Sequence, residues 1–340
     1  MKETSIEKPQ VTVIVPVYNV APYIEECAVS LFNQTIKNIE YIFIDDASTD
    51  NSLEVLENVI NKYPERKKLI RIIKHQTNKG VSYTRQEGVG LAQGEWIIHC
   101  DSDDTVSPEI YEKLLKNADT NIDVVICSYT LFGDDTPKIY KNQGFGDFSG
   151  REGISLLTGV RDETLHGGLC NKMIRRHLYE DIEFPENISF CEDLMVLLRL
   201  FIKHKEIVVR TLPDSLYNYR VRANSLVAQK TEKRKKELET LIYLLERIGE
   251  ESEPEISREI DARIVITIYN LLILTNEPKT IFDNYRQYKN SAQTTKGLNP
   301  LKKIHLISVL KGYFLLSSLI GLINQMGKGG IKKLKRIYIK

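Results

Sequence analysis

Five short runs made mostly of apolar residues, separated by segments with helical spacing, constrain the fold of this chain more than any other feature. The runs that predict strands are Val11–Val15, Ile39–Ile44, Ile70–Ile73, Trp96–Cys100 and Val124–Cys127. Between them, apolar residues recur at helical spacing, as Ile24, Cys27 and Leu31 do after Pro22. A strand without polar alternation is buried on both faces. The pattern therefore predicts an α/β sheet that is largely parallel and covered by helices.

Polar and acidic residues follow three of these runs at the point where each predicted strand ends. They are Pro16–Tyr18 after the first run, Asp45 and Asp46 after the second, and Asp101–Asp104 after the fourth. In open α/β sheets, ligands bind outside the carboxyl ends of the strands. The three segments therefore predict a binding site at that edge of the sheet.

The segment Trp96–Asp104 places three carboxylates directly after a buried strand. In an extended chain, Asp101 and Asp103 share one face and Asp104 points to the other. Clustered carboxylates repel one another unless a cation lies between them, and oxygen ligands suit Mg²⁺ or Mn²⁺. The alternative is an acidic turn that caps a helix expected near Pro108.

Composition and charge narrow the class of protein. The 340 residues are 42% hydrophobic and 27% charged, which predicts a globular protein of two or three units, and the formal net charge of +1 provides no bulk attraction to nucleic acid. The five cysteines include no Cys-x-x-Cys, which argues against a disulfide framework or a zinc site. Because the N-terminus lacks an apolar signal region, we expect a cytoplasmic protein.

The character of the sequence changes twice along the chain. We expect an α/β domain over residues 1–228, a helical extension over 229–295 and a basic, apolar tail over 296–340. The tail holds ten Lys or Arg residues and no Asp or Glu, and the polar residues of Ile304–Ile323 fall into two short helical stripes. These features favour a helix that lies on the cytoplasmic face of the cell membrane. The alternative is a core helix packed on the α/β domain.

Seven short motifs, taken in order, resemble those of glycosyltransferase family 2, the inverting nucleotide-sugar enzymes with the GT-A fold. They are Val13–Asn19, Asn33–Thr35, Asp45–Asp50, Asn78–Ser82, Asp101–Asp104, Asn171–Met173 and Glu192–Asp193. The resemblance implies a GT-A domain, with a Rossmann-like and mostly parallel sheet, and a C-terminal helical extension. It also implies a metal-dependent hexosyltransferase that moves a sugar from a UDP-sugar to a glycan or lipid-linked acceptor in cell-surface polysaccharide synthesis.

The same resemblance implies which residues bind the nucleotide-sugar. They are Pro16, Tyr18, Asp45, Asp46, Arg85, Asp101 and Ser102. Asp46 resembles the residue that accepts a hydrogen bond from the uracil imide, and an acceptor-only carboxylate suits that donor. Each assignment has an ordinary structural alternative, because Asp45 and Asp46 can cap a helix and Arg85 can be a solvated helix charge.

The metal ligand and the base are implied in the same way. Asp103 resembles the metal-binding member of an Asp-x-Asp motif, and Asp193 resembles the general base that deprotonates the acceptor hydroxyl. A metal would neutralise the diphosphate while a carboxylate on the opposite face removes the acceptor proton, which inverts the anomeric centre. Further contacts to the acceptor or diphosphate are expected from Asp104, Lys172, Glu192 and Arg220. Glu192 and Asp193 can also simply begin a helix.

One residue departs from the family pattern. Cys170 precedes Asn171 where many relatives have tryptophan. An aromatic platform for the acceptor sugar is therefore missing, or other residues supply it.

Two other classes of protein remain as alternatives. A Rossmann dehydrogenase or a nucleotidyltransferase would share an α/β sheet, but no Gly-x-Gly-x-x-Gly follows the first predicted strand, which argues against the dehydrogenase. A non-catalytic module would keep the nucleotide-sugar site and lack turnover. The presence of Asp101, Asp103 and Asp193 argues against such a module, and a UDP-sugar hydrolysis assay separates the two.

Overall fold

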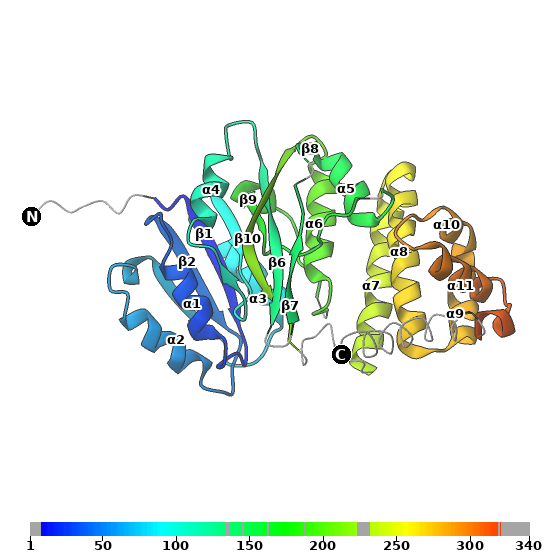
Figure 1. Cartoon of the computed structure of the whole chain (residues 1–340), viewed down its shortest axis with the longest axis horizontal. Coiled ribbons are helices and arrows are strands. Elements are labelled where there is room, and N and C mark those ends of the chain that lie inside the picture. Colours follow the sequence, from blue (N-terminus) through cyan, green and yellow to red (C-terminus); the bar gives the residue numbers. More distant parts are fainter. Residues whose placement is uncertain are drawn as a thin grey trace, which may run out of the picture. The chain divides into compact units, whose positions relative to one another are not determined.

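The computed structural model describes residues 8–133, 136–144, 146–161, 163–186, 188–222, 232–318 and 320. The chain divides into two compact units (Figure 1). The first, which we call the sheet unit, comprises Met1–Gly153 and Leu165–Gln229. The second, the helical unit, comprises Ile154–Thr164 and Lys230–Lys340. The inclusion of residues 154–164 in the helical unit has no counterpart in the sequence pattern.

One mixed sheet forms the centre of the sheet unit. Its strands are β1 (Val11–Val17), β2 (Ile39–Asp45), β3 (Ile70–Lys74), β4 (Trp96–His99), β5 (Thr105–Val106), β6 (Val124–Gly133), β7 (Thr136–Lys141), β8 (Phe148–Ser149), β9 (Lys172–Arg175) and β10 (Val208–Arg220). Their order is β3-β2-β1-β4-β9-β6-β10-β5, with β7 paired to β6 and β8 paired to β10.

The predicted α/β sheet is confirmed, and its first half is parallel as the apolar runs indicate. β1 pairs in parallel with β2 and β4, and β2 pairs in parallel with β3. The second half is mixed, because β9 enters between β4 and β6 and runs antiparallel to both. The sequence signal for β9 is weak, since the strand has four residues and two of them are basic.

The bounds of β1 and β10 depend on where each strand has a ladder partner. β1 continues through Pro16 to Val17, although a proline was expected to end it. β4 pairs with β1 only as far as Ile14, so Pro16 lies where that side of β1 has no ladder partner and its missing N–H costs no hydrogen bond. β10 is one long strand whose register against β6 shifts between Leu212 and Tyr217, around Pro213 and Ser215.

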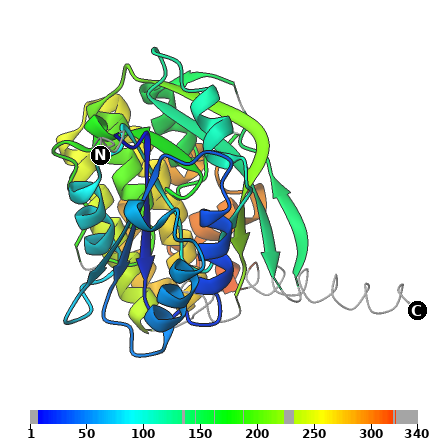
Figure 2. The ribbon, with the colours of Figure 1, turned by 90° about the vertical axis from the view of Figure 1, so that its left-hand side faces the viewer.

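Helices cover both faces of the parallel strands. The helices of this part of the chain are α1 (Ile24–Phe32), α2 (Ser52–Asn61), α3 (Val81–Leu91), α4 (Ile110–Lys116), α5 (Gly150–Thr158) and α6 (Glu192–Lys203). Val13 of β1 packs in one core with Leu31 of α1. Ile14 points to the other face and meets α3 so closely that a Cβ on Gly88 would lie 2.4 Å from its Cγ2. Figure 2 shows α1 and α3 on opposite sides of these strands.

The helical unit consists mainly of α7 (Glu232–Glu251), α8 (Pro254–Thr275), α9 (Pro278–Tyr285), α10 (Lys289–Thr294) and α11 (Pro300–Leu310). α7 buries one apolar face, which includes Leu238, Leu241 and Leu245. In the part of the chain that the structure describes, no helix is both long and apolar enough to cross a membrane.

The predicted tail begins within this unit. His305 and Ser308 of α11 form part of the stripe that the sequence places at a membrane surface, but both are buried in the helical unit. The ring of His305 packs edge-on against Tyr269 of α8, and Ser308 Oγ donates to His305 O (2.7 Å). The second stripe, apart from Ser317, and the lysines after it lie outside the described residues.

Candidate nucleotide-sugar site

The carboxyl ends of β1, β2 and β3 lie side by side, as the rule for parallel strands predicts. The N–H of Asp46 donates to Val17 O (2.8 Å), and the N–H of His75 donates to Asp45 O (2.9 Å). Asp45 is buried and accepts from the N–H of Ser48 (3.3 Å). Tyr18, directly after β1, is 47% exposed, so its ring is available at this edge.

Asp46 holds the turn that precedes α3. Its Oδ1 accepts from the N–H of Lys79 and its Oδ2 from the N–H of Gly80, both at 2.8 Å. His75 Nδ1 lies 2.7 Å from Oδ1. Sequence analysis allowed Asp46 to cap a helix, but its carboxylate accepts from the turn just before α3 and not from the first helical N–H groups of α3. A carboxylate oxygen accepts two hydrogen bonds, so Oδ2 retains capacity for a ligand donor.

His75 is a residue of this edge that sequence analysis missed. Its imidazole is buried between two carboxylates, with Nδ1 2.7 Å from Asp46 and Nε2 2.7 Å from Glu87. Burial lowers the pKa of His75, but the hydrogen bonds to the two carboxylates outweigh it and raise the pKa above its ordinary value. A signal was present, because His75 directly follows β3 at the edge where the other site residues lie.

Residues 101–104 form a turn, so the prediction that they alternate as in a strand is wrong. The N–H of Asp104 donates to Asp101 O (3.0 Å), which closes the turn. Asp104 is 1% exposed and accepts from Tyr217 Oη (2.6 Å) and from the N–H of Arg220 (2.7 Å). Both oxygens of the Asp104 carboxylate accept hydrogen bonds from β10, and this geometry does not support the prediction that Asp104 contacts a substrate.

The other two carboxylates of the turn face arginines. Asp101, whose side chain is 32% exposed, lies 2.6 Å from Arg85 Nη2. Asp103 lies 2.6 Å from Arg222 Nε. Burial and the charge of Asp101 raise the pKa of Asp103 to about 6, although Arg222 acts in the opposite direction. Ser102, between them, is buried.

Arg85 connects the acidic turn with the start of α6. It is 4% exposed, so it is not a solvated helix charge, and its Nε lies 3.4 Å from Glu192 Oε1 while its Nη2 contacts Asp101. Among the described residues, its buried Nη1 has no hydrogen-bond partner. A buried guanidinium nitrogen without an acceptor is costly, which makes this atom a candidate contact for an anionic ligand.

Glu192 and Asp193 begin α6, as the structural alternative predicts, and they also lie near Arg85. Asp193 Oδ1 accepts from the N–H of Leu194 (2.8 Å). Burial raises the pKa of Asp193, with Arg85 acting in the opposite direction. Burial and the neighbouring Asp193 raise the pKa of Glu192 to about 8. Glu192 is 5% exposed and paired with Arg85, so it positions that arginine rather than reaching a ligand.

Replacing Glu192 tests this environment. Its pKa in the folded protein lies above the unfolded value, so its contribution to stability is present at low pH and is lost as the pH rises through about 8. Glutamine keeps the shape and does not titrate. The melting temperature of Glu192→Gln should therefore fall less than that of the parent between pH values of about 6 and 9, as differential scanning fluorimetry can measure. If the melting temperatures of the parent and the variant change equally with pH across that range, Glu192 is not a buried, neutral carboxyl.

The side chains of Lys172 and Arg220 are bonded to other parts of the protein. Lys172 is 0% exposed and donates to Gly168 O (2.6 Å) and Asn171 Oδ1 (2.8 Å), and burial lowers its pKa to about 8. The ammonium of Lys172 is therefore bonded to the protein itself, and its contact with acceptor or diphosphate stays a prediction. Arg220 Nε donates to Asp103 O (2.8 Å), and its guanidinium also pairs with Glu26. It therefore holds the acidic turn in place.

The acidic turn can contribute ligands to a divalent cation. Asp101 and Asp103 supply the carboxylate oxygens that Mg²⁺ and Mn²⁺ prefer. Burial, and after it the charge of Asp101, raises the pKa of Asp103, and a cation beside these carboxylates would offset both effects. No group of three or more His, Cys, Asp or Glu side chains among the described residues is arranged to hold a metal alone. A cation bound by one or two carboxylates and completed by phosphate oxygens fits this donor set.

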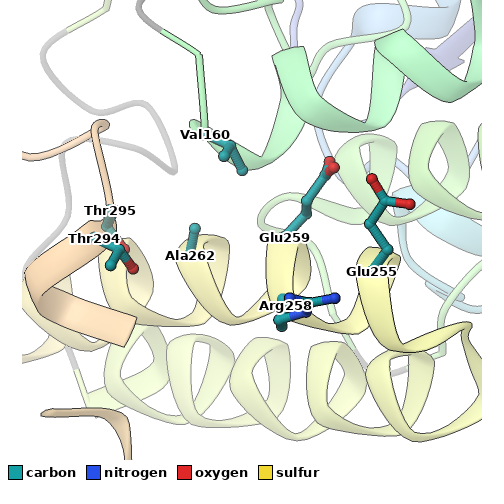
Figure 3. Close-up of a pocket in the computed structure, with 7 residues that line it drawn as sticks. All are labelled: Val160, Glu255, Arg258, Glu259, Ala262, Thr294 and Thr295. Atoms are coloured by element: carbon teal, nitrogen blue, oxygen red, sulfur yellow. The ribbon is translucent and has the colours of Figure 1, made fainter. Parts of the chain in front are cut away.

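A separate cavity of about 340 Å³ lies within the helical unit. It is lined by Val160, Glu255, Arg258, Glu259, Ala262, Thr294 and Thr295 (Figure 3). Glu255 and Glu259 extend on the same side of α8, and Glu259 accepts from Ser155 Oγ (2.8 Å). None of the residues that the sequence places in a nucleotide-sugar site lines this cavity.

The fold matches solved glycosyltransferase structures of the GT-A class. The crystal structure of S. aureus TarS 1-349 in complex with UDP-GlcNAc aligns with a TM-score of 0.67 and 17% identity, over 94% of this chain and 92% of that one. The mannosyltransferase PcManGT from Pyrobaculum calidifontis, in complex with GDP-Man and Mn²⁺, aligns with a TM-score of 0.55 and 16% identity, over 93% and 85% of the two chains. The predicted GT-A fold with C-terminal helices is thereby confirmed.

Sequence comparison identifies the family. The model of glycosyl transferase family 2 matches residues 12–183, which include the acidic turn. The putative glycosyltransferase EpsH of Bacillus subtilis (strain 168) is 30% identical over 284 residues, which cover 81% of this chain and 79% of EpsH. The chain belongs to glycosyl transferase family 2.

Proposed function

We propose that this enzyme transfers a sugar from a UDP-sugar to a hydroxyl of a glycan or lipid-linked acceptor, with inversion at the anomeric carbon and with Mn²⁺ or Mg²⁺ as cofactor. The observation that carries the proposal is the position of Arg85. It pairs with Asp101 of the acidic turn and with Glu192 of α6, and its buried Nη1 has no hydrogen-bond partner among the described residues. A diphosphate beside the turn would supply that acceptor.

An aromatic ring and a carboxylate oxygen support the proposal that the donor is a nucleotide-sugar. Tyr18 offers an exposed ring at the edge where Asp46 Oδ2 retains acceptor capacity, which suits a nucleobase. Pro16 and Asp45 shape the same edge, and Asp101 and Ser102 would lie at the ribose. TarS was solved with UDP-GlcNAc and PcManGT with GDP-Man, so a uracil nucleotide is favoured and a guanine nucleotide is the alternative.

In the transfer step, the bond between the anomeric carbon and the diphosphate breaks, which leaves positive charge on the sugar and negative charge on the diphosphate. Each charged side chain of the site acts on one part of this step. Asp103, with Asp101, would hold the cation, which neutralises the diphosphate as it leaves. Arg85 binds the same diphosphate from α3. Asp193 takes the proton of the acceptor hydroxyl as that oxygen attacks the anomeric carbon, and its pKa, raised by burial, strengthens it as a base. One displacement with one base inverts the configuration.

A thermal-shift screen tests the donor. UDP-, GDP- and TDP-sugars are added to the full chain with and without Mn²⁺, and a ligand that binds the folded state raises the melting temperature. We expect stabilisation by a UDP-sugar that needs Mn²⁺, followed by release of UDP on turnover. Stabilisation without UDP release by any acceptor or by water would favour a non-catalytic binding module. The absence of stabilisation by every nucleotide-sugar would contradict the proposed function.

Replacing Asp46 tests whether it contacts the nucleotide as well as the turn. In Asp46→Asn the amide keeps one acceptor and places a donor beside the N–H groups of Lys79 and Gly80. We expect UDP affinity to fall and the free energy of unfolding to fall by about 1–3 kcal/mol, because the turn loses a buried acceptor. Calorimetric titration with UDP and chemical denaturation measure the two effects. Lower stability with unchanged UDP affinity would show that Asp46 stabilises the turn before α3 and does not contact the nucleotide.

We also propose that the helical unit associates with the cytoplasmic face of the membrane, where a lipid-linked acceptor would lie. Leu315 and Leu316 are 91% and 47% exposed, and the exposed Lys311 lies four residues before Leu315. Exposed leucines can enter the interface, and each lysine adds about 1 kcal/mol of attraction to anionic headgroups.

Vesicle flotation tests this association. The full chain should bind phosphatidylglycerol-containing vesicles more than pure phosphatidylcholine vesicles, and less at high salt. The double variant Leu315→Glu, Leu316→Glu should lose binding, whereas Tyr243→Glu, an exposed position on α7, should not. Truncation at Pro300 is unsuitable, because it removes buried α11 residues. If the parent ignores anionic vesicles at low salt, the tail does not act at a membrane.

A further inference from the structure

Three half-buried aromatic rings lie together in the sheet unit, and the proposed chemistry does not use them. They are Tyr129 of β6, Tyr219 of β10 and His166, which precedes the Asn171 motif. The ring centroids of Tyr129 and His166 are 4.7 Å apart, and those of His166 and Tyr219 are 6.4 Å apart. We call these three residues the aromatic cluster.

The register of the sheet places the aromatic cluster beside the acidic turn. Tyr129 pairs with Tyr217 across β6 and β10, and alternate residues of a strand share a face, so Tyr129, Tyr217 and Tyr219 point to the same side of the sheet. Tyr217 Oη donates to Asp104 Oδ2 (2.6 Å) and accepts from the N–H of Asp101 (3.2 Å). Tyr129 and Tyr219 therefore lie on the face of the sheet that contacts the acidic turn.

The aromatic cluster also adjoins the proposed base. A Cβ built on Gly168 would lie 2.5 Å from His166 Cε1 and 3.4 Å from Asp193 Oδ2. The imidazole and the carboxylate thus flank the same glycine, and that glycine has no side chain to separate them. The cluster therefore adjoins Asp193 through His166 and the acidic turn through the strand that carries Tyr219.

His166 adds a hydrogen-bond donor to the cluster. Its Nδ1 accepts from the N–H of Gly168 (3.3 Å), and burial, with Lys172 nearby, lowers its pKa to about 3. A neutral imidazole whose Nδ1 accepts carries its proton on Nε2. Within the described residues Nε2 has no hydrogen-bond partner, so its N–H is available to a ligand.

Aromatic faces, a neutral donor and nearby carboxylates together suit a sugar ring. A pyranose presents C–H groups on its faces, which pack on aromatic rings, and hydroxyls around its rim, which need donors and acceptors. Cys170, at the position where many relatives have tryptophan, is 4% exposed and offers no such surface.

We propose that the aromatic cluster of Tyr129, His166 and Tyr219 is a platform for a pyranose ring of the acceptor, which turns the attacking hydroxyl toward Asp193. This inference rests on the proposed function and narrows its acceptor to one that ends in a sugar, in place of a lipid hydroxyl without a sugar.

Saturation-transfer-difference NMR on the full chain with UDP and Mn²⁺ tests the platform. The probes are the methyl glycosides of glucose, galactose and N-acetylglucosamine. At least one should receive saturation on its ring protons, and Tyr129→Leu and Tyr219→Leu should each weaken its binding about fivefold. Tyr140→Leu is the matched control, because Tyr140 pairs with Thr130, whose side chain points to the other face of β6 from Tyr129. UDP affinity measured on every variant reports whether it is folded.

Each outcome has a distinct meaning. Binding of UDP with no saturation of any glycoside overturns the platform and leaves the proposed function intact. Equal glycoside binding in the parent and in folded Tyr129→Leu and Tyr219→Leu also overturns it. If these variants weaken UDP-sugar affinity but not glycoside affinity, the ring on the platform is the donor's and the inference is wrong. Failure of the parent to bind UDP contradicts the proposed function itself.

Discussion

Asp193→Asn should lower the rate of sugar transfer by about 10²–10⁴-fold while leaving Mn²⁺-dependent UDP affinity unchanged. The amide cannot take a proton from the acceptor, but its oxygen can still accept from the N–H of Leu194, so the start of α6 is preserved. Steady-state assays of UDP release and calorimetric titration with UDP measure the two quantities. The loss should appear in kcat, since the proton moves only in the transition state.

Glu192→Gln is the matched control for this variant, because it changes the adjacent carboxyl in the same chemical way. Glu192 is largely neutral at pH 7, given its pKa of about 8, and the carbonyl oxygen of a glutamine can still accept from Arg85, so Glu192→Gln should lower transfer far less than Asp193→Asn does. Equal loss of activity in both variants would indicate damage to α6 rather than loss of a base. An equal loss of UDP affinity in Asp193→Asn would contradict the assignment of Asp193.

Asp103→Asn should remove the Mn²⁺-dependent part of UDP binding, with affinity in Mn²⁺ falling at least about tenfold. A neutral amide is a weaker ligand for a hard cation than a carboxylate, and it also gives up the ion pair with Arg222. Titrations of UDP with Mn²⁺ and with a chelator give the metal-dependent increment directly. In the variant the two titrations should agree.

Asp214→Asn controls for the loss of one negative charge. Asp214 pairs with Lys113 on the surface of the sheet unit, 2.9 Å apart, and its removal should leave UDP binding unchanged. If chelation has no effect on UDP binding by the parent, or if Asp103→Asn retains the full Mn²⁺ increment, Asp103 is not a metal ligand.

The sequence was sufficient for the parallel half of the fold and for the edge where the site lies. Runs made mostly of apolar residues, such as Ile39–Ile44, predict buried strands, and strands that are buried on both faces and alternate with helices leave few arrangements. Asp46 and Asp101 directly follow two of these predicted strands. Because the carboxyl ends of parallel strands meet at one edge of the sheet, the sequence pattern is enough to place both residues there.

The partners of these residues depended on contacts between distant segments. Asp104 follows Asp103 directly, yet it is bound to Tyr217 and Arg220, more than a hundred positions away, because the turn rotates its carboxylate toward β10. Lys172 reads as a surface charge and is completely buried. Composition and spacing carry no signal for such pairings, since they arise when non-consecutive strands meet.

The sequence by itself therefore determined the family, the strand edge and the acidic motifs, because these are encoded in runs of a few residues. Only the tertiary structure decided which carboxylates pair with arginines and which accept hydrogen bonds from the sheet. It committed Asp104 to β10, placed His75 against Asp46 and brought Arg85 between Asp101 and Glu192. The physical reason is that charge and burial at each position are set by side chains that folding brings from elsewhere in the chain.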